Sequence, residues 1–165
     1  MNSIIQATLK NLQKTEKLLS ILSNDMLSSA SVPPYNSSIG SHIRHVLDFY
    51  DCLFVEGNRI NLTARKRNME VETDCEIALS YYHHIVEKLN LLKENDLEKL
   101  VVVTDNLGLG NTEIRYTFSG LLAQANSHTI HHYAIINYIL EGLGCCINDE
   151  DFGYNPTTPK KVTSN

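Results

Sequence analysis

The order of apolar and polar residues predicts four helices. From Ser3 to Ser28, apolar side chains recur at steps of three, four and seven residues, which indicates one amphipathic helix. The same helical period recurs in three later segments. Ser37 or Ser38 can cap the second helix, Thr73 or Asp74 begins the third, and Gly142 or Gly144 can end the last. The predicted helices span approximately residues 3–28, 37–61, 73–92 and 119–144.

The segment from Leu100 to Phe118 has a different pattern. Val101-Val102-Val103 is β-branched, residues 112–116 alternate polar with apolar, and the residues between are rich in turn formers. We expect a small β-hairpin between the third and fourth helices. Four helices with one apolar face each bury those faces together, so the expected fold class is all-α, a four-helix bundle carrying this hairpin. One domain is expected over residues 1–165, with a tail from about residue 146 that docks on the bundle or trails it.

Composition and charge limit the classes of partner. No apolar run reaches the roughly 18–20 residues that a membrane span needs. The first residues, MNSIIQATLKNLQK, lack the features of an export signal, so we expect a cytoplasmic protein with no membrane partner. The net charge of −5 argues against nucleic-acid binding. Arg59 and Arg65-Lys66-Arg67 form the one basic cluster, interpreted as cations at the C-terminal end of the second helix.

The four cysteines include no C-x-x-C pair, and we expect them to be reduced. The adjacent Cys145 and Cys146 have no role that the sequence identifies.

Two histidines interrupt the apolar face of the last helix. His128 and His132 are four residues apart, which places their side chains one above the other on the helix. Burying two imidazoles without partners costs free energy, and neutral imidazole suits Zn, Ni, Cu and Fe. We therefore expect a divalent metal site here. The same arc holds Leu121, Ala125, His128, His132, Ile135 and Ile139.

A third ligand is expected from the second helix, which offers His42 and His45. His45 shares an arc with Phe49 and Cys52, but the apolar residues of this helix centre nearer His42. The helical pattern by itself therefore favours His42 and leaves His45 as the alternative.

Two segments resemble the DinB/YfiT-like superfamily of metal-binding four-helix bundles. They are residues 38–48 (Ser-Ile-Gly-Ser-His-Ile-Arg-His-Val-Leu-Asp) and 126–133 (Asn-Ser-His-Thr-Ile-His-His-Tyr). The hairpin and the Asp151-Phe-Gly tail extend the likeness over nearly the whole chain in element order. Many members continue the histidine pair with Arg-Gly-Gln, whereas Tyr133-Ala134-Ile135 stands here.

The resemblance implies a three-histidine site that holds Zn, Ni or Fe, and often a homodimer. Its ligands would be His45, His128 and His132, with His131 as a substrate-facing or supporting group. Such a site leaves room for water or substrate, as catalytic metal sites do. Asp48, Glu56 and His131 are the candidate proton-transfer or orienting residues.

Two functions are compatible with these residues. Relatives implied by the resemblance are thiol S-transferases or hydrolases, so the first is a metal-dependent enzyme acting on a small molecule, for example a low-molecular-weight thiol. The alternative is a non-catalytic metal-binding or dimerising bundle, whose dimer interface would be the apolar stripe of the first helix. The simpler interpretation of that stripe is core.

Overall fold

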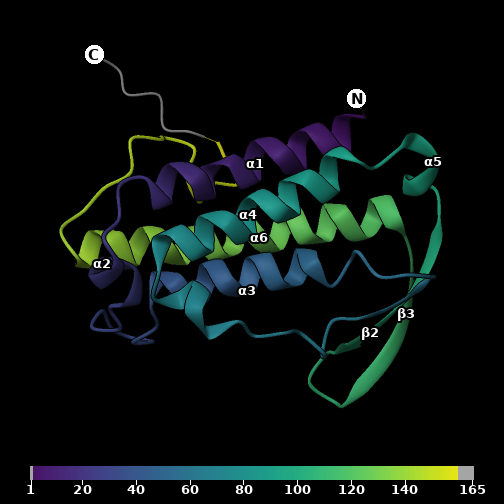
Figure 1. Cartoon of the computed structure of the whole chain (residues 1–165), viewed down its shortest axis with the longest axis horizontal. Helices are drawn as coiled ribbons and strands as arrows, with labels where there is room; N and C mark the ends of the chain where they lie inside the picture. The colour runs from purple at the N-terminus through teal and green to yellow at the C-terminus, as the bar shows by residue number, and fades with distance from the viewer. Residues whose placement is uncertain (1, 160–165) are drawn as a thin grey trace.

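The computed structural model describes residues 2–159 and contains a group of long helices with a small sheet at one end (Figure 1). The helices are α1 (Ser3–Leu19), α2 (Asn24–Ser28), α3 (Ile39–Asp51), α4 (Cys75–Asn90), α5 (Glu94–Leu97) and α6 (Phe118–Gly142), with a 3-10 turn η1 (Met69–Glu72). The strands are β1 (Arg59–Asn61), β2 (Leu100–Asn106) and β3 (Asn111–Thr117).

The four long helices pack side by side, with α4 and α6 each contacting both α1 and α3 (Figure 1). Their starts are fixed by local hydrogen bonds, because the first amides of a helix have no partner within the helix. The side chains of Ser38, Asp74 and Thr117 accept bonds from the first amides of α3, α4 and α6. The third helix, predicted to start at Thr73 or Asp74, has Asp74 as its cap.

The prediction of one helix from Ser3 to Ser28 is wrong. The chain leaves the helix after Leu19 and starts α2 at Asn24, with Ser23 as its cap. Fully buried apolar side chains lie on both sides of this break, for example Leu12 and Leu27. The regular spacing therefore reports which side chains enter the core, whereas the caps decide where the helix ends. The apolar stripe of α1 is core within this chain.

The all-α fold class is also wrong, because the chain is mixed α/β with a three-stranded sheet in the order β1-β2-β3. Strands β2 and β3 form an antiparallel hairpin in the predicted segment. The predicted second helix was extended to Asn61, but α3 ends at Asp51 and Arg59–Asn61 instead pairs parallel to β2. The sheet contributes Ile60 and Val103 to the core, so it is part of the packed structure rather than an appendage.

The segment after α6 packs back on the helices. Phe152 is buried and stacks on Tyr133 of α6, with ring centroids 4.8 Å apart. Lys14 of α1 forms an ion pair with Asp149. The described part of the predicted tail therefore docks, and residues 160–165 lie outside the described residues.

Gly40 allows η1 to pack directly against α3. A Cβ atom at this position would lie 2.1 Å from the backbone oxygen of Glu72. Glu72 in turn forms an ion pair with Arg44, one helical turn beyond Gly40. The close contact thus fixes the segment that leads from the sheet back to α4.

We expect Gly40→Ala to destabilise the protein by about 1–3 kcal/mol, the usual cost of overpacking. The helix-forming preference of alanine gains only about 1 kcal/mol, and a backbone atom cannot move aside as a side chain can. Denaturant unfolding measures the difference. The matched control is Gly120→Ala in α6, where the nearest atom is the Thr117 hydroxyl at 3.2 Å. Equal stability of Gly40→Ala and the wild type would contradict the packing described.

Candidate metal centre

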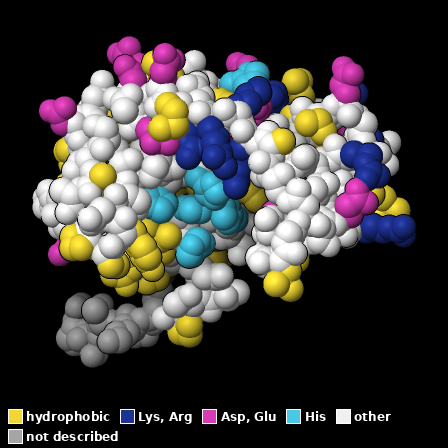
Figure 2. Space-filling view, turned by 90° about the horizontal axis from the view of Figure 1, so that it is seen from below, with side chains coloured by type: hydrophobic (Ala, Val, Ile, Leu, Met, Phe, Trp, Pro, Cys, Tyr) yellow, Lys and Arg dark blue, Asp and Glu magenta, His cyan; other side chains and the backbone are white. Residues whose placement is uncertain are grey.

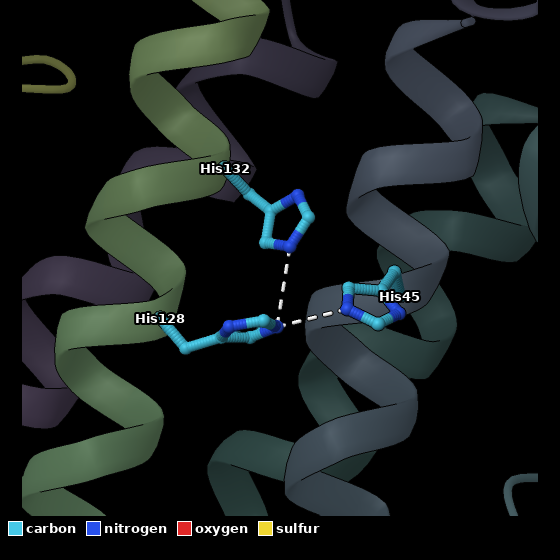
Figure 3. Close-up of side chains that lie close together, drawn as sticks. All are labelled: His45, His128 and His132. Carbon is cyan, nitrogen blue, oxygen red and sulfur yellow. Dashed lines mark hydrogen bonds between the residues drawn. The ribbon is translucent and has the colours of Figure 1, made fainter. Parts of the chain in front are cut away.

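Three histidines from two helices converge between α3 and α6 (Figure 3). His45 projects from α3, and His128 and His132 project from α6, one turn apart. The two helices run antiparallel, because His42 contacts His132 whereas His45 contacts His128. His132 is buried, and the other two cluster histidines are half-buried. We call His45, His128 and His132 the histidine cluster.

The ring nitrogens of the histidine cluster face one another. Nε2 of His128 lies 2.8 Å from Nε2 of His45 and 3.2 Å from Nε2 of His132. One potential ligand atom from each residue lies within 4.8 Å of the other two. Each nitrogen of a neutral imidazole carries either one proton or one lone pair, so Nε2 of His128 cannot form two full hydrogen bonds. The cluster without an ion is therefore left with a poorly satisfied polar contact.

A metal ion would remove this conflict, because it accepts the lone pairs of all three nitrogens. At a Zn–N distance of about 2.0–2.1 Å and tetrahedral angles, ligand nitrogens lie about 3.3 Å apart. The two shorter separations observed are close to that value. Within residues 2–159, no cysteine or carboxylate joins the group, so three protein ligands would leave a position for a further molecule.

Neighbouring side chains hold two of the cluster rings from behind. Nδ1 of His42 lies 2.8 Å from Nδ1 of His132, and Nε2 of His42 lies 2.8 Å from the Ser37 hydroxyl. The Phe49 ring packs against His128 at a centroid distance of 5.0 Å. The helical pattern favoured His42 as the third ligand. In the structure His42 instead contacts Nδ1 of His132, the nitrogen on the other side of that ring from the one that faces His128.

Arg65 reaches the histidine cluster from the loop after β1. Its Nη1 atom lies 3.1 Å from Nδ1 and 3.4 Å from Nε2 of His45. Figure 2 shows histidine side chains gathered at one place on the surface, directly beside Lys or Arg side chains. The basic cluster was interpreted as the end of the second helix, and this interpretation is wrong, because α3 ends fourteen residues before Arg65, at Asp51.

The remaining candidates lie at different distances from the cluster. His131 is exposed and its ring centroid is 5.3 Å from that of His132. Asp48 is buried, and its described hydrogen bonds and ion pair are with Arg44 and the Tyr81 hydroxyl. Glu56 is exposed in the segment after α3. His131 is therefore placed near the cluster, whereas Asp48 is held in a separate network.

Burial lowers the pKa of every histidine in the cluster, because it disfavours the charged imidazolium. The pKa of His132 falls to about 2 through burial and then through repulsion from His128 and His45. The pKa of His45 falls to about 3 through burial and then through Arg65. The pKa of His128 is lowered by burial, then by His131 and Arg65, while Asp105 of β2 acts weakly in the opposite direction. Neutral imidazoles are the form that binds a metal.

No family model, no curated protein and no solved structure matches the chain. The resemblance to the DinB/YfiT-like superfamily consequently stays a prediction made from the motif residues. No helix within residues 2–159 has the length and apolar character needed to cross a membrane.

The sequence did not identify Arg65 or Ser37 as neighbours of the cluster. The helical spacing did place Phe49 on the arc of His45, and its ring packs against His128. Ser37 lies just before the cap of α3 and gives no comparable signal. Arg65 follows β1, whose pairing with β2 joins segments far apart in the sequence, and no local pattern predicts such a pairing.

We expect the metal-free protein to lose stability as the pH falls from about 6.5 towards 3. The unfolded chain protonates its histidines near pH 6.5, whereas His45 and His132 stay neutral in the fold until about pH 3 and 2. Between these values the unfolded state binds more protons, so each histidine lowers the unfolding free energy by up to about 1.4 kcal/mol per pH unit. Urea unfolding from pH 7 to pH 4 measures the slope.

Replacing both residues in His45→Gln/His132→Gln should reduce that slope. The matched control is His84→Gln, because His84 is an exposed histidine of α4. Equal slopes in the wild type and the double variant would contradict the low pKa values of the cluster.

Proposed function

We propose that this protein is a metal-dependent enzyme that uses His45, His128 and His132 to hold one divalent ion. The observation that carries the proposal is the convergence of three Nε2 atoms on one point between α3 and α6. The low pKa of each cluster histidine keeps the lone pairs free near neutral pH. Zn, Ni and Fe are the candidate ions, since all three accept imidazole ligands.

The contacts behind the cluster support this assignment. A histidine that gives Nε2 to an ion carries its proton on Nδ1, and metal-bound histidines usually donate that proton to a neighbouring acceptor. Nδ1 of His132 has such a neighbour in Nδ1 of His42, and Nε2 of His42 can donate a hydrogen bond to the Ser37 hydroxyl. With an ion bound, this chain of contacts would accept the Nδ1 proton of His132 and leave its Nε2 lone pair directed into the cluster.

An open position supports catalysis rather than a purely structural role. Structural zinc sites are closed by four protein ligands, whereas catalytic sites keep one place for water or substrate. A bound divalent ion would supply Lewis acidity, lowering the pKa of a water or thiol beside it. His131 is exposed next to the cluster and is the candidate to accept or deliver a proton there. A role for Asp48 would have to act through Arg44 or Tyr81.

The reaction we propose is thiol S-transfer or hydrolysis of a small molecule. The proposal rests on the motifs shared with the DinB/YfiT-like superfamily, residues 38–48 and 126–133. A low-molecular-weight thiol is the candidate substrate, and a homodimer the candidate assembly. An activity screen of metal-loaded protein with small thiols and electrophiles, and with ester and amide substrates, separates transfer from hydrolysis.

The metal content of the purified protein tests the site directly. We expect about one ion per chain in protein purified without a nickel column, because three neutral imidazoles bind Zn, Ni or Fe firmly. His45→Ala, His128→Ala and His132→Ala should each lower bound metal to near zero. Elemental analysis measures the content, and His84→Ala is the control for loss of a histidine elsewhere. A metal content well below one ion per chain in the wild type, or an unchanged metal content in all three variants, would contradict the proposal.

His42→Ala distinguishes a supporting residue from a ligand. We expect binding of one ion per chain with an affinity reduced about 10–100-fold, the usual effect of removing the hydrogen-bond partner of a metal ligand. His42→Asn should lose less, because its side-chain oxygen can still accept from Nδ1 of His132. Competition with a chelator measures both affinities. If His42→Ala abolished binding while His45→Ala retained it, His42 would be the ligand.

A further inference from the structure

Arg65 forms no ion pair with any acidic side chain of residues 2–159. Among residues 2–159, its described polar contacts are to the two ring nitrogens of His45, and it forms no ion pair. Two of its basic neighbours are paired with carboxylates, since Lys66 pairs with Asp51, and Arg44 pairs with Asp48 and Glu72. A half-buried guanidinium whose described polar contacts are imidazole nitrogens is poorly compensated, because it has given up water without gaining a carboxylate.

The contact of Arg65 with His45 does not supply the missing negative charge. Nη1 of Arg65 lies 3.1 Å from Nδ1 and 3.4 Å from Nε2 of His45, and an atom that is nearly equally distant from both ring nitrogens lies over the ring. A cation over an imidazole ring gains a weak attraction and no opposite charge. The positive charge of Arg65 therefore stays without a counterion beside the cluster.

The total charge of a loaded site also calls for an anionic ligand. The three imidazoles are neutral, so a divalent ion (+2) and Arg65 (+1) together bring about three positive charges into one small region. Asp105 acts on the pKa of His128 in the opposite direction, and its effect is the smallest of those named there. An anionic ligand on the open side of the cluster would compensate both cations.

We propose that Arg65 is the anion-binding residue of the site and that the small molecule bound at the open position carries an oxyanion, a carboxylate or phosphate. The planar guanidinium matches both groups, because it can donate two parallel hydrogen bonds to them. Nη1 of Arg65 lies 3.4 Å from the His45 nitrogen that faces His128, so the anion is held directly beside the cluster. This assignment names the substrate class for the site under Proposed function and rests on it.

The test uses protein loaded with Co²⁺, whose visible absorption responds when an anion enters the coordination shell. Acetate and inorganic phosphate are titrated separately as the carboxylate and phosphate probes. We expect at least one of them to bind to the wild type and Arg65→Gln to weaken that binding at least about tenfold, as loss of a charge-assisted hydrogen bond predicts. The stronger of the two probes identifies the oxyanion that the site prefers.

Arg67→Gln is the matched control, because it removes the same charge from an exposed side chain two residues away. It should change the dissociation constant less than about twofold, and Arg65→Lys should recover part of the lost affinity. Cobalt content is measured for each variant first, and Arg65→Gln should keep one ion per chain.

Equal anion binding by Arg65→Gln and the wild type, with cobalt bound in both, would overturn the role of Arg65 and leave the metal site intact. An equal loss in Arg67→Gln would reduce the effect to general surface charge and would also overturn it. Failure of the wild type to take up cobalt would instead contradict the proposed function, and the anion site with it.

Discussion

Three imidazole nitrogens meet at one point between α3 and α6, and each can contribute only one proton or one lone pair there. The fold keeps the rings half-buried or buried, lowers the pKa of each cluster histidine, and holds two of the rings with His42 and Phe49. A cation is the partner that all three lone pairs can share.

The helices α3 and α6 position the histidine rings, and the loop after β1 brings a positive charge beside them. The antiparallel packing of α3 and α6 matches His45 to His128 and His42 to His132, so one pair forms part of the cluster and the other supports it. Strand β1 is only three residues long, but its pairing with β2 turns the following loop back towards α3. The loop delivers Arg65 to the edge of the cluster, where a cation next to neutral imidazoles favours an anionic ligand.

Local periodicity predicted the parts of the site that lie on one helix. His128 and His132 were identified because i, i+4 spacing on an apolar face places two imidazoles together. The helical pattern favoured His42 over His45, but both rings lie between α3 and α6, where His42 contacts Nδ1 of His132 and His45 contacts Nε2 of His128. The resemblance favoured His45, which is the residue that lies in the cluster. The all-α class failed because β1 has one buried side chain and no period of its own. Arg65 was missed because the pairing of β1 with β2, two segments far apart in the sequence, places it beside His45.

The position of the ion is the most direct test of the central claim. Crystals of zinc-loaded protein, measured at the zinc absorption edge, would give an anomalous peak for each bound ion. We expect one peak at about 2.0–2.1 Å from Nε2 of His45, His128 and His132. A peak bound by His42 in place of His45, or ordered zinc only at surface sites such as His83 and His84, would contradict the three-histidine centre.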